Sequence, residues 1–322
     1  MIDSADRTEK PLRIVVTGAS GFVGGQVATA LANDGHDVIG VARRKNGWTH
    51  QNGRYLSADL SVRPDAVFVA DADVVVNAAA STDTLLPIAE ALRQNRDSTL
   101  HLPLAFPGAR IVHISSSSVY PVSWGGALLR EEDATATRFL SSYSASKWAA
   151  EQTLAKMPQG KSAIVLRPHA VYGAGDKTLL PRLEQLLRGN FLVLPKGTDC
   201  PHTLTSITNL VNAVRCAVRS GASAGTYNIT DAGEVSLTDV FRKVLGLRTG
   251  RKIRVLQIPT GLAWRVATLA ERLYRVGLVG ASSVNRYAIH AIAAPKRLDI
   301  FRARTELGYE PLPTDLSDAA IW

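Results

Sequence analysis

The segment from Leu12 to Arg44 constrains the fold more than any other part of the sequence, because a glycine-rich turn joins two apolar runs there. It reads LRIVVTGASGFVGGQVATALANDGHDVIGVARR. Leu12 to Val16 is a short β-branched run, typical of a strand covered on both faces of a parallel sheet. Apolar residues then recur at helical spacing from Val23 to Leu31, and Asp37 to Ala42 forms a second apolar run. The segment predicts a β-α-β unit.

Three glycines lie in the turn between the first strand and the helix. They allow a tight turn in which backbone N–H groups at a helix N-terminus approach a pyrophosphate, and the helix dipole favours the anion. Glycines also serve purely structural turns, so the position between a strand and a helix is what favours a dinucleotide site. We predict that the turn binds the dinucleotide through Gly18, Ser20, Gly21, Phe22, Val23 and Gly24.

The end of the second strand bears on the choice between the two nicotinamide dinucleotides. An acidic residue there would bind a free ribose 2′-hydroxyl and repel a 2′-phosphate. This chain has Ala42 at that place, followed by Arg43 and Arg44. Because guanidinium groups bind phosphate bidentately, the sequence favours NADP, with NAD as the alternative. The arginines can also be read as solvated surface residues.

Small or polar residues follow three further apolar runs, in the segments 54–60, 72–80 and 109–120. Ligands of open α/β sheets lie at the carboxyl ends of the strands, so these residues should gather around one crevice. Asp59 is the candidate for the adenine edge, and the alanines would let the cofactor lie against the sheet. The residues predicted from these strand ends are Asp59, Leu60, Asn77, Ala78, Ala79 and the serines at 115–118.

Composition excludes several other classes of protein. The chain has 322 residues, of which 46% are hydrophobic and 20% charged, as in ordinary folded proteins. Its first ten residues do not resemble a secretory signal and no long apolar run occurs, so we expect a cytoplasmic protein. The net charge is +9, but the basic residues are scattered, which argues against nucleic acid as a partner. Cys200 and Cys216 lack ligand spacing, so we expect reduced thiols and no metal site.

Six motifs resemble the short-chain dehydrogenase/reductase superfamily in its extended, epimerase-like branch. They are TGASGFVGG (17–25), ADL (58–60), NAAA (77–80), ISSSSVYP (114–121), YSASK (143–147) and RPHAVYGAGD (167–176), in the family's order. The resemblance implies an α/β fold, a Rossmann-type doubly wound parallel sheet with a smaller C-terminal substrate-binding lobe. We expect the nucleotide domain at 12–173 with a return near 207–230, and the lobe at 174–206 and 231–322.

The resemblance also implies a catalytic set of Tyr143, Lys147 and Ser116, with Ser115 or Ser117 as substitutes for Ser116. Residues four apart are neighbours on a helix, so the ammonium of Lys147 is expected to lower the pKa of Tyr143 from its usual value of about 10. Tyr143 would move a proton, Ser116 would bind the same oxygen, and the nicotinamide would carry the hydride. Without the other motifs, the pair would be only two neighbours on a helix face.

The motif RPHAVYG is expected to pass beside the nicotinamide ring. The resemblance places Pro168, His169 and Ala170 near that ring, with His169 as a pocket wall rather than a general acid. For Tyr172 we expect packing in the core.

Two departures from the family pattern narrow the reaction. Ser117 and Ser118 stand where sugar-nucleotide dehydratases carry Asp-Glu, and HTLTSITNL (202–210) lacks the arginine and acidic pair of many sugar-nucleotide epimerases. The C-terminal part, ending in LGYEPL, resembles the 3β-hydroxysteroid dehydrogenase-like reductases. We therefore expect an enzyme that interconverts an apolar ketone and a secondary alcohol. The alternatives are a sugar-nucleotide epimerase or 4-ketoreductase, and a protein that senses NADP without turnover.

Two predicted surfaces concern partners other than the small-molecule substrate. In the segment 258–278, Leu262, Val266, Leu269, Leu273 and Val276 form one apolar stripe. We expect the stripe to pack on the substrate lobe, with peripheral contact to a membrane surface as the alternative. The family also implies a homodimer through the helix of Tyr143, for which Trp148, Ala149 and Leu154 give an apolar face. The alternative for that face is packing within the chain.

Overall fold

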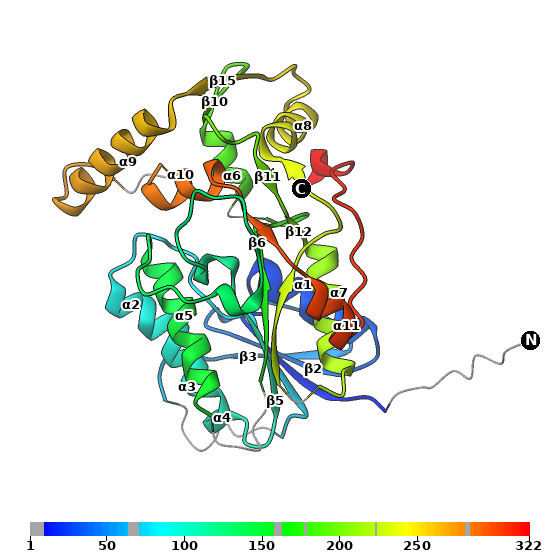
Figure 1. Ribbon diagram of the computed structural model, residues 1–322. Coiled ribbons are helices and arrows are strands. Elements are labelled where there is room, and N and C mark those ends of the chain that lie inside the picture. Colours follow the sequence, from blue (N-terminus) through cyan, green and yellow to red (C-terminus); the bar gives the residue numbers. More distant parts are fainter. Residues whose placement is uncertain (1–9, 64–70, 158–162, 177–178, 223, 281–283) are drawn as a thin grey trace, which may run out of the picture.

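A seven-stranded parallel sheet forms the centre of the molecule (Figure 1). The computed structural model describes residues 10–63, 71–157, 163–176, 179–222, 224–280 and 284–322, so most of the N-terminal decapeptide lies outside them. The strand order is β13-β7-β5-β4-β1-β2-β3, with parallel pairing throughout. The strands are β1 (Arg13–Thr17), β2 (Asp37–Ala42), β3 (Gly53–Ser57), β4 (Val74–Asn77), β5 (Arg110–Ile114), β7 (Ala163–Pro168) and β13 (Gly225–Ile229).

Helices cover both faces of this sheet, and the alternation of side chains along β1 shows why both faces are apolar. Ile14 and Val16 belong to the core on one face, whereas Val15 belongs to the core on the other. The first face carries α1 (Phe22–Asn33), α7 (Ile207–Arg219) and α11 (Phe301–Leu307). The second carries α2 (Ile88–Leu92), a π-helical turn (Arg93–Asp97), α3 (Ser98–Leu100), α4 (Leu102–Ala105) and α5 (Ser142–Ala155).

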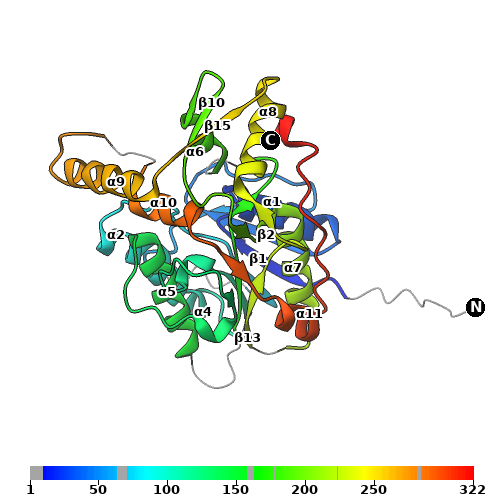
Figure 2. The same cartoon turned by 45° about the horizontal axis from the view of Figure 1, so that its top comes forward.

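A smaller lobe lies beyond the carboxyl ends of the strands, and its elements come from distant parts of the chain (Figure 2). Its own apolar core joins residues such as Leu183, Leu194, Phe241 and Leu316. Its helices are α6 (Leu179–Gln185), α8 (Leu237–Thr249), α9 (Thr260–Arg275) and α10 (Arg286–Ala293). Its three-stranded sheet has β9 (Leu187–Arg188), β10 (Phe191–Pro195) and β15 (Arg254–Ile258). Two-residue strands pair as β8 (Val171–Tyr172) with β12 (Thr205–Ser206), β11 (Pro201–His202) with β14 (Val235–Ser236), and β6 (Leu128–Leu129) with β16 (Arg297–Leu298).

The predicted fold class is confirmed. The second predicted strand has the bounds of β2, and the first differs from β1 by one residue. The segment 225–230 contains β13 at the edge of the central sheet. α11 lies inside the range expected for the lobe, yet Ala303 and Leu307 pack in the core of the sheet. The exact division of the chain into lobes stays a prediction.

The expected packing of the apolar stripe on α9 is wrong. Four of its five residues, Leu262, Val266, Leu269 and Val276, are between 52% and 68% exposed, and the fifth, Leu273, is half-buried. The buried residues of the helix are instead Ala263 and Ala267, which pack with Ile289 of α10, and Glu271, which pairs with Arg286 of α10 at 2.8 Å. The small side chains let α9 and α10 approach closely, so the larger apolar side chains of α9 point outward. α9 lies at the periphery of the molecule in both views (Figures 1 and 2). Contact of the stripe with a membrane surface stays a prediction.

None of the helices that the structure describes is both long and apolar enough to cross a membrane. The apolar face predicted on α5 is largely used within the chain. Leu154 is buried in the core with Ile111, and Trp148 packs against Val119 and Tyr120. Leu154 offers no free surface for a partner, whereas Trp148 and Ala149 are half-buried, and dimerisation through this helix stays a prediction. Cys216 is buried, Cys200 is half-buried, and both are free thiols.

Candidate active site

One large pocket opens between the carboxyl ends of the central strands and the smaller lobe, with a volume of about 680 Å³. Six strand ends of the central sheet contribute to it, those of β1, β2, β3, β4, β5 and β7. All the predicted site residues except Asn77 line it. They are Gly18, Ser20, Gly21, Phe22, Val23, Gly24, Arg43, Arg44, Asp59, Leu60, Ala78, Ala79, Ser116, Tyr143, Lys147, Pro168, His169 and Ala170.

The glycine turn is shaped by two close backbone approaches. Gly18 has φ of 70°, a left-handed conformation, and a Cβ there would lie 2.8 Å from the carbonyl oxygen of Ala78. A Cβ on Gly24 would overlap the carbonyl oxygen of Gly18. The helix α1 can therefore begin directly over the end of β1, which leaves its first N–H groups facing the pocket for an anion.

Asn77 does not line the pocket, which corrects its assignment as a cofactor-binding residue. It is buried at the end of β4, where its side chain accepts a hydrogen bond from Thr17 Oγ1 (2.7 Å) and donates one to Thr99 Oγ1 (3.1 Å). Thr17 in turn accepts from the backbone N–H of Ala79 at 3.2 Å. Asn77 thus holds the ends of β1 and β4 together from beneath the pocket.

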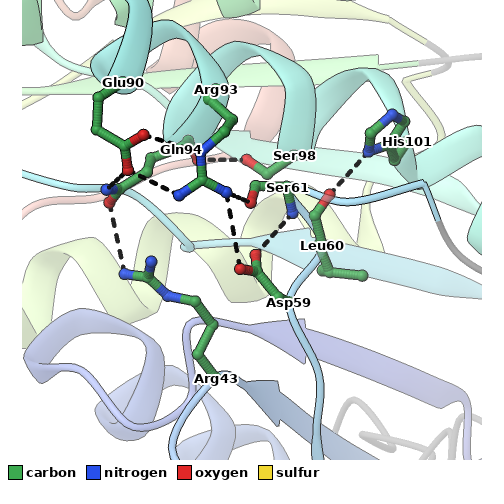
Figure 3. Close-up of polar contacts among 9 residues, drawn as sticks. All are labelled: Arg43, Asp59, Leu60, Ser61, Glu90, Arg93, Gln94, Ser98 and His101. Atoms are coloured by element: carbon green, nitrogen blue, oxygen red, sulfur yellow. Dashed lines mark hydrogen bonds and ion pairs between the residues drawn. The ribbon is translucent and has the colours of Figure 1, made fainter. Parts of the chain in front are cut away.

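Figure 3 shows the end of the pocket where the adenosine is expected. Asp59 lies 3.8 Å from Arg93, and Arg43 donates a hydrogen bond to Gln94 (3.4 Å). Burial raises the pKa of Asp59, but hydrogen bonds from Ser61 and the charges of Arg43 and Arg93 outweigh it and hold the pKa below its ordinary value. This end of the pocket is therefore polar. It carries the carboxylate of Asp59 and the exposed guanidinium of Arg43.

Tyr143 lies in the first turn of α5, and Ser141 is the N-cap of this helix. The Ser141 side chain caps the helix by accepting a hydrogen bond from the N–H of Ser144 (3.1 Å). The hydroxyl of Ser116, at the end of β5, lies close enough to the Tyr143 phenol to lower its pKa. The two neighbouring serines point elsewhere, since Ser115 donates to Glu151 and Ser117 contacts His169 Nδ1 at 2.6 Å. Of the three candidate serines, Ser116 is the one placed beside the tyrosine.

The expected effect of Lys147 on Tyr143 is wrong for this arrangement. Burial raises the pKa of Tyr143, and the nearby Ser116 hydroxyl only opposes that rise. The Lys147 ammonium donates to the carbonyl oxygen of Ile114 at 2.5 Å. Burial lowers the pKa of Lys147 to about 8, although Glu151 opposes this. The phenol is therefore protonated near neutral pH, as a proton donor must be.

A buried ion pair beneath α5 fixes the positions of these side chains. Glu151 lies one turn after Lys147 and pairs with Arg167 at 2.6 Å, with both side chains only 5% exposed. Glu151 also accepts the hydroxyl of Ser115, and Arg167 donates to the carbonyl oxygen of Glu131 at 2.8 Å. The pair therefore joins α5 to the ends of β5 and β7, the two strands that flank the tyrosine.

The end of β7 turns sharply into the pocket. Ala170 has φ of 45°, a strained conformation for a residue with a side chain, and such strain concentrates at functional sites. The preceding His169 is held in place because its N–H donates to Thr205 Oγ1 at 3.0 Å. Burial lowers the pKa of His169 well below its ordinary value, so it is neutral and forms a pocket wall. Tyr172, two residues further on, is buried in the core of the lobe.

The half of the pocket inside the smaller lobe is mainly apolar. Tyr287 of α10 lies close to Tyr143, and burial raises its pKa, which the charge of Tyr143 reinforces. This lobe also contributes two cationic side chains to the pocket lining, Arg182 and Lys296. The apolar side chains from this lobe include Leu179, Leu180, Leu183, Leu186, Leu204, Leu237, Val240, Phe241, Val244, Ile292, Leu316 and Trp322.

Sequence reasoning missed several of these residues. Glu151 has a local signal, because it falls four residues after Lys147 on the same helix face. Arg167 was within a quoted motif but had no assigned role. Tyr287, Arg182 and Lys296 have no comparable signal, since they reach the pocket only through the folding of the lobe.

The comparisons with known proteins agree with this geometry. Residues 14–230 match the model of the NAD dependent epimerase/dehydratase family. A 3-beta-hydroxysteroid dehydrogenase of Mycolicibacterium neoaurum is 27% identical, over 94% of this chain and 88% of that protein. A 4-hydroxy-2-methyl-3-oxo-4-farnesyl-3,4-dihydroquinoline-1-oxide ketoreductase of Stigmatella aurantiaca is 29% identical over 92% of each chain.

Among solved structures, a UDP-glucuronic acid 4-epimerase from Bacillus cereus in complex with NAD superimposes with a TM-score of 0.73. The match covers 96% of each chain, but the identity is 19%, so it shows a shared fold. The family match spans the glycine turn, the serine-rich end of β5, the helix of Tyr143 and the last strand of the sheet. The chain belongs to the NAD dependent epimerase/dehydratase family.

Proposed function

We propose that this protein is an NADP-preferring oxidoreductase that interconverts a ketone and a secondary alcohol on an apolar substrate. The observation that carries the proposal is the placement of the Tyr143 phenol beside the Ser116 hydroxyl, where the dinucleotide half of the pocket meets its apolar half. A carbonyl oxygen placed there would meet both hydroxyl groups. The substrate's carbon skeleton would extend into the lobe.

In the direction of reduction, Tyr143 donates its proton to the carbonyl oxygen, and Ser116 donates a hydrogen bond to the same oxygen as charge develops. The raised pKa of Tyr143 keeps the proton in place until the substrate binds. The Lys147 ammonium, held by the carbonyl of Ile114, supplies positive charge near the site. A nicotinamide bound beside Pro168 and Ala170 would supply the hydride.

An apolar substrate is supported by two observations. The side chains that enter the pocket from α6 and α8 are almost all leucine, valine and phenylalanine, so burying a polar sugar there would leave its hydroxyl groups without partners. The two curated relatives described above are named for a steroid and for a farnesylated quinoline, both largely apolar. The alternative, a sugar-nucleotide epimerase or 4-ketoreductase, is an outcome of the test.

The preference for NADP is supported by Ala42, Arg43 and Arg44 at the end of β2. Both guanidinium groups line the pocket and are exposed, and Arg43 has a neutral partner, Gln94. A 2′-phosphate could therefore bind Arg43 without breaking an ion pair within the described part of the chain. Replacing both arginines by alanine should lower the ratio of kcat/KM for NADPH over NADH by roughly 10-fold or more.

The test follows NADPH and NADH oxidation against steroid, alkyl and sugar-nucleotide ketones. We expect the apolar ketones to be reduced, and Tyr143→Phe to lower kcat by roughly 100- to 10,000-fold while the cofactor Kd is retained. Equal activity of Tyr143→Phe and wild type would contradict the role of the tyrosine. Turnover of sugar nucleotides alone would establish the alternative. Cofactor binding without turnover of any ketone would favour a sensing protein.

A further inference from the structure

Lys296 is a buried ammonium that the proposed reaction does not use. It follows α10, is only 9% exposed, and lines the pocket together with His290 and Tyr287. Lysine is rarely buried without a partner, because removing its charge from water costs several kcal/mol. A group of this kind in a pocket is a candidate for a functional role.

No carboxylate within the described residues pairs with this ammonium. The contact that the structure gives its Nζ is the face of the Tyr120 ring, at 5.9 Å from the centroid. That ring is already covered by the guanidinium of Arg167, at 5.3 Å. Burial alone lowers the pKa of Lys296 to about 8, with no acidic neighbour to raise it. Lys296 is therefore still mostly charged at neutral pH and its charge is not balanced.

The neighbouring titratable groups do not offset the positive charge of Lys296. His169, His202 and His290 all have lowered pKa values, mainly through burial, and the charge of Lys296 contributes to each. His169 and His202 stack with ring centroids 6.0 Å apart. All three imidazoles are neutral, and none of them balances the ammonium.

The Lys296 region is connected to the reacting end of the pocket. His169 contacts Ser117, the residue after Ser116, and it lies at the strained end of β7. A ligand that reaches from Tyr143 toward Lys296 would pass this histidine. Asp176, the acidic residue that lines the pocket on the lobe side, accepts the N–H groups of Leu179 and Leu180 at the start of α6.

We propose that Lys296 binds the carboxylate of the substrate, so that the substrate is an apolar keto acid whose ketone lies at Tyr143. This inference rests on the proposed function. One ammonium matches one carboxylate, whereas a diphosphate binds best to several donors. The bound anion would supply the counter-charge that the protein itself lacks at this place, and the apolar half of the pocket would take the rest of the chain.

The test uses a series of oxododecanoates, in which the ketone lies at increasing distance from the carboxylate, each paired with its methyl ester. For at least one acid, wild type should show kcat/KM roughly 10- to 100-fold above that of its ester, the range expected for a charge-assisted hydrogen bond. Lys296→Met should remove that advantage and leave the ester unchanged. Lys296→Arg should keep most of it.

Matched variants separate this role from structural effects. Lys252→Met removes an exposed lysine from the same lobe and should keep the preference for the acid. Arg182→Met removes the other cation that the smaller lobe contributes to the pocket lining. Loss of the preference in Arg182→Met but not in Lys296→Met would overturn the proposal. So would an equal loss for acid and ester in Lys296→Met at unchanged thermal stability, or wild type that does not prefer any acid to its ester.

A binding measurement keeps the inference separate from the proposed reaction. Dodecanoate has no ketone, so its Kd, measured by calorimetry with and without NADPH, does not depend on turnover. Wild type should bind it roughly 10-fold or more tightly than Lys296→Met and Lys296→Gln do. If that difference appears although no ketone is reduced, the carboxylate site stands and the proposed reaction fails. Equal Kd values for wild type and both variants would overturn the site.

Discussion

The two halves of the pocket differ in how the chain builds them. The cofactor half comes from the ends of consecutive strands, so short motifs such as residues 17–25 and 77–80 form it almost alone. The substrate half is assembled from α6, α8, α10 and the segment that ends at Trp322, which are far apart in the sequence. The first half is polar and exposes backbone N–H groups, whereas the second is mainly apolar with a few charged side chains.

This difference shows what each half is constrained to do. A pyrophosphate requires specific backbone geometry, so the residues of the turn cannot vary freely without loss of binding. An apolar substrate requires a cavity of the right shape, which many combinations of leucine, valine and phenylalanine can provide. Changes in one half should therefore affect cofactor binding alone, and changes in the other should affect the substrate alone.

The largest effect should come from Gly18→Ala. The new Cβ would lie 2.8 Å from backbone atoms of Ala78 and Ala79, and the residue would keep an unfavourable left-handed φ. The glycine turn must shift, and a displacement of about 1 Å at a functional site lowers its effectiveness roughly 100-fold. We expect the Kd for NADPH, measured by fluorescence titration, to rise by that factor.

Gly35→Ala is the matched control for this substitution. Gly35 also has a left-handed φ, of 90°, but an added Cβ meets no atom within 4 Å and the residue does not line the pocket. It should lower the stability of the chain through backbone strain and leave the Kd for NADPH unchanged. Equal Kd values for the two variants would show that the close approach at Gly18 does not shape the site.

A smaller effect, confined to the substrate half, is expected for Leu186→Ala. Leu186 is half-buried and lines the pocket, so its truncation removes apolar surface from the substrate without opening the core. Kinetics with a saturating cofactor should show kcat/KM for an apolar ketone reduced by roughly 10-fold, with the Kd for NADPH unchanged. Leu247→Ala, at a position on α8 that is 42% exposed, is the control and should change neither value. A raised Kd for NADPH in Leu186→Ala would break the separation of the two halves.

The smallest effect is expected for a substitution on α9, which lies outside both halves of the pocket. Val266 is 53% exposed, so Val266→Ser should change the free energy of unfolding by less than about 0.5 kcal/mol. Ala267→Val, at the next position, should cost about 1–3 kcal/mol because Ala267 is fully buried against α10. Urea denaturation measures both. A large loss in Val266→Ser would restore the original expectation that the stripe packs inside the chain.

Most residues of the cofactor half could be predicted from the sequence, but the position of Asn77 and the choice among three serines could not. Asn77 was expected in the pocket because it ends a strand, but the side chain at that register points into the core and binds Thr17 and Thr99. The choice between Ser115, Ser116 and Ser117 was open in the sequence, because consecutive residues on an extended chain point in opposite directions and a shift of one residue exchanges them. The placement of Ser116 beside Tyr143 came from the structure.

The pKa values of Tyr143 and Lys147, and the face of α9 that is buried, could not be predicted from the sequence either. Helical spacing brings Lys147 near Tyr143, but burial and the carbonyl of Ile114 decide the charge of each group. Periodicity finds an apolar stripe on α9 and cannot tell which face another helix will cover. The small residues Ala263 and Ala267 were the ones that α10 covered.

The sequence by itself determined the first β-α-β unit, the glycine turn and the Tyr-Lys pair, because each depends on residues close together in the chain. Hydrophobic periodicity and turn chemistry act over only a few residues, so they can be read directly. The tertiary structure alone decided that Glu151 pairs with Arg167, that Ala170 is strained, and that Lys296 is buried without an acidic partner. Those features arise where distant segments meet, and burial there sets the free energy of each charge.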